Sequence, residues 1–196
     1  EGIIAEDNDR DILMRSMPDL LEKIPNDKKS NAIYLSRFIA ASSIGLYDAA
    51  LNYVWNEVVI NLRKKVLNYG LSRFYDNAIT ENKRSLYNNE SDLIGINDRL
   101  LLDTMHKLEW ISTVIYKKLI HILDMRNMIG ASHPNSSIIV SYDLLSWFNT
   151  CVNDVINEAP TKSAIEANNI IKSIKNEELE LTNEQLMHME NHIRDM

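Results

Sequence analysis

The sequence contains little of what disulfide-rich or membrane-spanning proteins require. Its 196 residues include one cysteine, four prolines and five glycines. With Cys151 alone, the chain cannot form an internal disulfide, and a reducing compartment is favoured. No apolar run approaches the roughly 20 residues of a membrane-spanning helix, and residues 1–10 are acidic, unlike a signal peptide. We therefore expect a cytoplasmic protein without membrane association.

Several motifs of common enzymes are also missing. The glycines stand at positions 2, 45, 70, 95 and 130 and form no phosphate-binding loop of the Walker or dinucleotide type. There is no paired cysteine metal site and no Gly-x-Ser-x-Gly turn. His188 and His192 are four residues apart, which suits a metal on a helix, but the sequence offers no third ligand. We expect no cofactor and no metal.

Apolar residues recur at helical spacing through most of the chain. The clearest stripe runs from Ile44 to Leu62, and a second runs from Leu108 to Ile122. The sequence therefore predicts an all-α bundle with an acidic helical tail, and strict alternation occurs only over Ser137–Tyr142. The predicted helices cover residues 9–23, 36–69, from Ser91 or Asp92 to 105, 108–129, from Pro134 through Val155, 161–175 and 181–194, with a connector at 27–30 and a loop or short helices at 76–92.

The net charge of −7 is unevenly distributed. Residues 1–27 carry eight acids and three bases, and residues 154–196 carry nine acids and four bases, so each end has a net charge of −5. The middle, 28–153, has fourteen bases against eleven acids, a net charge of +3. Six of these bases fall within 61–84, among them Lys64 and Lys65. Such a run indicates either a solvated helix face or a track for phosphate groups.

One arginine falls where an apolar residue is expected. Arg126 follows Ile122, Leu119 and Ile115 at helical spacing, so it lies on the stripe that faces the bundle interior. A cation there requires a partner or a cleft. His133 follows seven residues later, and small polar groups surround the pair; they are Asn127, Ser132, Asn135, Ser136 and Ser137. The residues fit a phosphate site, or an Arg126 that pairs with a carboxylate such as Asp124 or Asp48 beside a structural His133.

Arg126-Asn127 followed by His133 resembles the Arg-x4–6-His signature of the HEPN superfamily, the higher eukaryotes and prokaryotes nucleotide-binding domains. The resemblance covers roughly residues 36–155 and implies an up-and-down antiparallel helical bundle. Residues 1–35 are then an N-terminal helical extension, and residues 156–196 are an acidic tail or a linker to a further domain.

The resemblance implies a metal-independent endoribonuclease of a bacterial anti-phage or toxin–antitoxin system. The 2′-hydroxyl of RNA would attack the adjacent phosphate, with His133 as general base or acid. Arg126 would neutralise charge on the phosphoryl oxygens, and Asn127 would orient them. Substrate-binding roles are expected for Ser132, Asn135, Lys64 and Lys65. The expected partners are RNA, a second copy of the chain that completes a composite active site, and an antitoxin or fused domain.

A second function remains open at this stage. Members of the family also bind nucleotides or partners without cleaving RNA, so the alternative is a non-catalytic module for dimerisation, ligand sensing or partner binding. The two functions differ in where they place Arg126 and His133. Catalysis requires both side chains in one accessible cleft, whereas a binding module allows either to be a structural contact.

Overall fold

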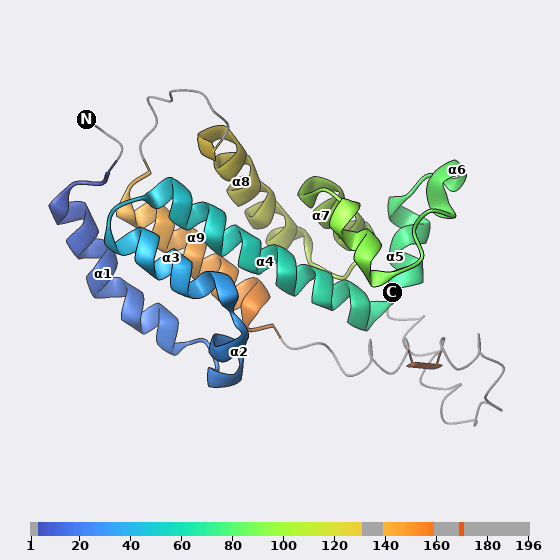
Figure 1. Ribbon diagram of the computed structural model, residues 1–196, viewed down its shortest axis with the longest axis horizontal. Coiled ribbons are helices and arrows are strands. Elements are labelled where there is room, and N and C mark those ends of the chain that lie inside the picture. The colour runs from blue at the N-terminus through green and yellow to red at the C-terminus, as the bar shows by residue number, and fades with distance from the viewer. Residues whose placement is uncertain (1–3, 131–138, 159–168, 171–196) are drawn as a thin grey trace.

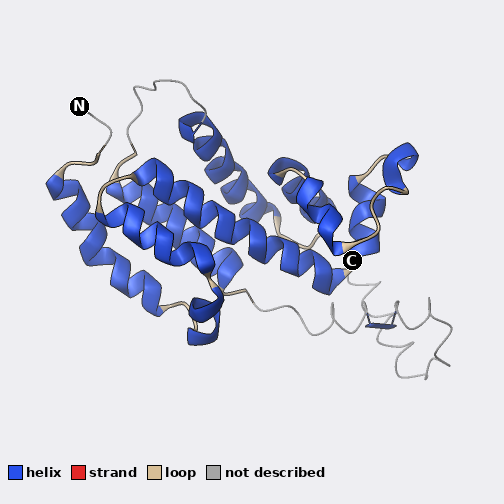
Figure 2. Ribbon diagram, in the orientation of Figure 1, coloured by secondary structure: helices blue, strands red, loops and turns tan. Residues whose placement is uncertain are grey.

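The computed structural model describes residues 4–130, 139–158 and 169–170, and these residues form helices and connecting loops without a strand (Figure 2). Ser132, His133, Asn135 and nearly all of 159–196 lie outside the described residues. The elements are α1 (Asp7–Glu22), α2 (Asn26–Asn31), α3 (Ile33–Ser43), α4 (Tyr47–Tyr69), α5 (Leu71–Ala78), α6 (Glu81–Arg84), the 3₁₀ helix η1 (Glu90–Gly95), α7 (Asp98–Lys107), α8 (Thr113–Gly130), α9 (Ser141–Cys151) and the π-helical turn η2 (Val152–Ile156). The predicted all-α class is confirmed for this part of the chain.

The longest helix, α4, lies at the centre of the bundle (Figure 1). It packs against α3, α8, α9 and η2, while α5, α6 and α7 gather at its C-terminal end. Apolar side chains along α4 are buried, including Leu51, Val54, Trp55, Val58 and Leu62. No helix among the described residues combines the length and apolarity that crossing a membrane demands.

The N-terminal helix belongs to the same hydrophobic core as residues 36–155. On α1, Leu13 and Met17 are buried, and the helix packs against α3 and α9. The carboxylate of Asp9 accepts hydrogen bonds from the backbone N–H of Ser141 at 2.9 Å and from its hydroxyl at 2.8 Å. Asp9 therefore caps the N-terminus of α9, which has no cap from its own N-cap side chain.

The single helix predicted over residues 36–69 is wrong, because the chain turns between α3 and α4. Gly45 has a φ of +79°, which favours glycine, and its carbonyl accepts a hydrogen bond from the Ala5 N–H at 3.0 Å. Ile44, counted in the apolar stripe, is 52% exposed at this turn. The predicted end of the helix at Gly70 is confirmed.

Other predicted boundaries also differ from the structure. The helix predicted from Pro134 begins, among the described residues, at Ser141 as α9, after a non-helical Ile139 and Val140. The expected connector at 27–30 is the helix α2. Asn97, rather than Ser91 or Asp92, caps α7, since its side chain accepts from the Leu100 N–H at 2.9 Å. The helix predicted from Leu108 begins at Thr113, after a turn in which Glu109 has a φ of +58°.

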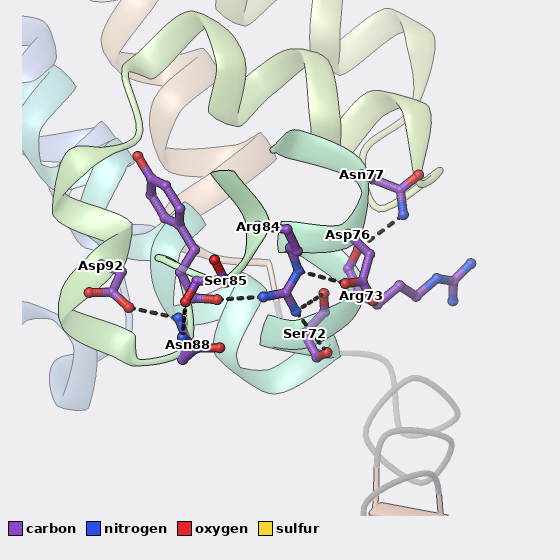
Figure 3. A network of polar contacts seen from close by, with 9 residues as sticks. Ser72, Arg73, Asp76, Asn77, Arg84, Ser85, Asn88 and Asp92 are labelled. Atoms are coloured by element: carbon purple, nitrogen blue, oxygen red, sulfur yellow. Dashed lines mark hydrogen bonds and ion pairs between the residues drawn. The ribbon is translucent and has the colours of Figure 1, made fainter. Parts of the chain in front are cut away.

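A network of polar contacts holds α5, α6 and η1 together (Figure 3). Arg84 donates to the Asp76 carboxylate at 2.6 Å, to the Ser72 hydroxyl at 3.2 Å and to the Tyr87 carbonyl at 2.6 Å. Asp92 accepts from the N–H groups of Asn88 and Asn89, both at 2.8 Å, and these bonds lower the pKa of its carboxyl group. Of the loop and the short helices that the sequence left open for residues 76–92, the structure has short helices joined by turns.

Replacing Gly45 by alanine should destabilise the fold. A Cβ would lie 2.9 Å from the Ala5 nitrogen, the Arg10 Cδ and the Ile4 Cγ2, at a φ that side chains disfavour. We expect a loss of about 1–3 kcal/mol in the free energy of unfolding, measured by urea denaturation. Gly95→Ala is the matched control, because its Cβ meets only the Tyr87 hydroxyl at 3.9 Å. Equal losses of unfolding free energy in the two variants would show that the close contacts and positive φ of Gly45 are not what makes the substitution destabilising.

The thiol of Cys151 should resist alkylation in the folded protein. It is fully buried, and burial, followed by the nearby Asp154 carboxylate, raises its pKa to about 12. At pH 8 this lowers the thiolate fraction roughly a thousandfold relative to an ordinary thiol. Iodoacetamide should label Cys151 rapidly only after unfolding in urea, whereas a Ser36→Cys variant adds an exposed thiol that reacts at once. Rapid labelling of native Cys151 would show that the core opens at this position.

Candidate functional site

Arg126 lies in the last two turns of α8 and connects three helices. Its Nε donates to the Asn52 side-chain oxygen on α4 at 2.9 Å, and one terminal nitrogen approaches Asp98 on α7 at 3.5 Å. The side chain is 29% exposed. Arg126 therefore faces the bundle, as its position in the apolar stripe predicts, and remains accessible from solvent.

Asp98 is the carboxylate that pairs with Arg126, instead of Asp124 or Asp48. Its Oδ2 also accepts a hydrogen bond from the indole N–H of the fully buried Trp55 at 2.8 Å. Asp124 instead pairs with Arg99 at 3.3 Å. The Asn97 cap places Asp98 in the first turn of α7, where a carboxylate is also favoured by the helix dipole.

Asn127 lies directly beside the guanidinium, since its side-chain oxygen accepts from Arg126 at 3.1 Å. The structure thus brings together two of the residues expected to act on a phosphate. Ser132, His133 and Asn135 lie outside the described residues, which end on this side at Gly130. The described part of the site consists of Arg126, Asn127, Asn52, Asp98 and Trp55.

Lys65 lies on α4, and its positive charge is paired with a carboxylate. Its ammonium pairs with the Glu158 carboxylate at 2.7 Å and stands 5.2 Å from the centre of the Tyr69 ring. Lys28 from α2 joins the same region, donating to the Ile156 carbonyl at 2.5 Å. Lys28, Lys65 and Glu158 line a cavity of about 160 Å³ together with Asn61, Leu62, Lys64, Asn68 and Val155.

The two predicted lysines do not adjoin Arg126. From Asn52, the α4 partner of Arg126, to Lys65 the helix rises roughly 20 Å and turns so that the two side chains point about 140° apart. Lys64 is exposed and lies between the Lys65 cavity and a second hollow on the other side of α4. Lys64 therefore borders both hollows, whereas Lys65 borders only the first.

Glu57 on α4 is a buried carboxylate near the start of α3. Only 3% of its surface is exposed, and it accepts from the Tyr34 N–H at 3.2 Å. Its second oxygen accepts from Asn61 at 3.2 Å. Glu57 therefore satisfies an unpaired donor of the α3 N-terminus and is structural.

Histidines within the described ranges have packing contacts. His106 stacks on Tyr116 at 4.3 Å and contacts the Thr113 hydroxyl at 3.1 Å, and His121 meets the edge of Trp147 at 6.3 Å. Across residues 4–130 and 139–158, no three His, Cys, Asp or Glu side chains gather as a metal site would require.

Asp98 and Trp55 are the site residues that sequence reasoning missed. Trp55 adjoins the apolar stripe, and Asp98 follows a capping asparagine. Neither position indicates a contact with Arg126, which is 28 residues further along the chain than Asp98. Asn52 is one of several polar residues beside the apolar stripe of α4, and its position in the sequence does not indicate a contact with Arg126.

Comparison with protein-family models, with curated protein sequences and with solved structures finds no match to this chain.

Removing the Asp98 carboxylate should destabilise the meeting point of α4, α7 and α8. In Asp98→Ala the buried Trp55 N–H loses its acceptor and Arg126 loses its counter-charge, so we expect a loss of roughly 1–3 kcal/mol in unfolding free energy. Asp98→Asn keeps an acceptor for Trp55 and should lose less.

Asp124→Ala is the control for this prediction, because its pair with Arg99 is exposed and should contribute under about 1 kcal/mol. Thermal and urea unfolding of the three variants measure the differences. If Asp98→Ala were as stable as Asp124→Ala, the Trp55 bond would have no structural importance.

Proposed function

We propose that this protein is a metal-independent endoribonuclease that cleaves RNA through Arg126 and His133. The observation that supports the proposal most is the placement of Arg126. A permanently charged guanidinium is oriented by Asn52 and Asp98, lies beside the Asn127 amide and is still partly exposed at the end of α8. Six residues separate Arg126 from His133 in the sequence, which matches the Arg-x4–6-His spacing of the HEPN superfamily.

In the proposed reaction, the ribose 2′-hydroxyl attacks the adjacent phosphorus. The 2′-oxygen–phosphorus bond forms, the bond from phosphorus to the 5′-oxygen breaks, and a 2′,3′-cyclic phosphate remains. One histidine accepts the 2′ proton, and a second, supplied by His133 of another copy of the chain, gives a proton to the leaving 5′-oxygen. Arg126 neutralises the charge that develops on the phosphoryl oxygens.

The pair with Asp98 modifies this role. With no ligand bound, the carboxylate offsets the positive charge of Arg126, which lowers the attraction for phosphate but keeps the guanidinium in one orientation. A phosphate that approaches the exposed side of Arg126 would share the guanidinium with the Asp98 carboxylate. Substrate affinity should then come in part from cations elsewhere on the surface.

A non-catalytic helical module is the second candidate function. It is favoured by the same contacts, because Arg126 and Trp55 share the Asp98 carboxylate and together join α4, α7 and α8. In that case Arg126 would be a structural residue, and its loss would lower stability without removing a reaction.

Cleavage of total RNA in EDTA tests the proposal. The wild type should release 2′,3′-cyclic phosphate ends, and Arg126→Ala and His133→Ala should each reduce the rate by at least about 100-fold. Arg99→Ala is the matched control, since it removes an exposed arginine from α7 and should leave the rate within a fewfold of the wild type.

The stability of each variant should be measured in parallel by thermal unfolding. Equal cleavage by Arg126→Ala and the wild type would exclude Arg126 from the chemistry. Absence of cleavage by a folded, dimeric wild type would contradict the endoribonuclease and favour the binding module.

A further inference from the structure

The second hollow beside Lys64 is a groove of about 500 Å³ between the C-terminal half of α4 and η1. This volume falls within the roughly 300–1,000 Å³ of small-molecule sites. Its lining combines aliphatic side chains with a few polar ones; the residues are Ile60, Arg63, Lys64, Leu67, Glu90, Ser91, Leu93 and Ile94. Ile94 is 74% exposed, so an apolar surface lies open beside two cations.

The two cations of the groove make no ion pair with any residue that the structure describes. The Nε of Arg63 is buried and has no hydrogen-bond partner among the described residues. Lys64 is exposed and forms no hydrogen bond or ion pair within the described part of the chain. By contrast, Arg84 and Lys65 nearby are each paired with a carboxylate. A buried donor without a protein partner is satisfied by water or by a ligand, so Arg63 Nε is available to bind one in the groove.

The charge of the lining restricts the ligand. Arg63 and Lys64 contribute two positive charges and Glu90 one negative charge, so the groove carries a net charge of +1. A phosphodiester, with one negative charge, matches this balance, whereas a phosphomonoester or inorganic phosphate would bring a second charge near Glu90. The exposed aliphatic wall suits the flat apolar face of a nucleobase.

The groove also lies in line with Arg126. Asn52, the α4 partner of Arg126, and Arg63 are eleven residues apart, which is close to three full turns, so they lie within about 20° of one another on the helix surface and roughly 16 Å apart along it. Asn56 and Ile60 lie between them, about 40° and 80° round the helix from Asn52, and all four side chains are partly exposed, whereas Val59 on the other edge of this stripe is buried. A partly exposed stripe of α4 thus leads from Arg126 to the groove.

We propose that the α4–η1 groove is a nucleotide subsite that binds one phosphodiester and base of a single-stranded nucleic acid whose chain follows this stripe towards Arg126. Arg63 and Lys64 bind the phosphate, and Ile60, Leu67 and Ile94 contact the base. The inference extends the proposed ribonuclease by naming where a distant part of its substrate binds. Binding in the groove does not require cleavage, so experiments can reject the subsite and the ribonuclease activity independently.

Binding of the dinucleotide d(ApA) to the full chain tests the subsite, because this probe has one phosphodiester and no 2′-hydroxyl to react. Followed by methyl NMR, it should shift the signals of Ile60, Leu67, Leu93 and Ile94, and AMP and inorganic phosphate should bind more weakly. Arg63→Gln and Lys64→Gln should each weaken d(ApA) binding about tenfold. Lys83→Gln, which removes an exposed charge from α6, should not change it.

Two further variants separate this inference from the proposed chemistry. Glu90→Gln should strengthen AMP binding more than d(ApA) binding, because it removes the repulsion of the second charge. Arg126→Ala should leave d(ApA) binding unchanged but weaken binding of the hexanucleotide d(A)6, which is long enough to follow the stripe.

The proposal is overturned if d(ApA) shifts none of the four methyl signals, or if Lys83→Gln weakens binding as much as Lys64→Gln does. It is also overturned if a poly-glutamate peptide binds the groove more tightly than d(A)6, since the natural occupant would then be an acidic protein segment. Groove binding without RNA cleavage would retain the subsite and reject only the ribonuclease.

Discussion

Burial of α4 at the centre of the bundle is the constraint on which the other features depend. Its apolar side chains contact α3, α8, α9 and η2, and their removal from water favours the packing of these helices around it. One side of α4 is thereby buried, and its other residues reach solvent to differing extents. The partly exposed residues include the stripe from Asn52 to Arg63, which adjoins Arg126 at one end and the α4–η1 groove at the other.

The same packing determines the state of Arg126. The guanidinium projects from α8 towards α4, where an unpaired charge would be costly, and it is stabilised by Asn52 and Asp98. Asp98 in turn satisfies the indole N–H of Trp55, which has no access to water. One carboxylate thus serves both the stability of the helix junction and the orientation of the cation. This shared use links the proposed catalytic role of Arg126 to its structural one.

Hydrophobic periodicity predicted the helical class and several elements, and it failed where backbone geometry interrupts the pattern. The stripe through Ile44 and Tyr47 continues at helical spacing across Gly45, so apolar spacing alone could not reveal the turn between α3 and α4. Likewise, Leu108 and Ile111 are buried although they precede α8, because the turn at Glu109 still directs them into the core. Burial depends on where a side chain lies in the folded protein, so residues on either side of a turn can both be buried although they belong to no single helix.

By itself, the sequence determined that the described chain is helical, that Cys151 is buried and that Arg126 faces the interior beside Asn127, because these properties follow from composition and from spacing within one helix. Only the tertiary structure decided that Asp98 is the partner of Arg126, that Lys64 borders two hollows and Lys65 only one, and that Arg63 lines a groove with η1. These depend on how helices distant in sequence pack together, and local periodicity carries no information about which residues then meet.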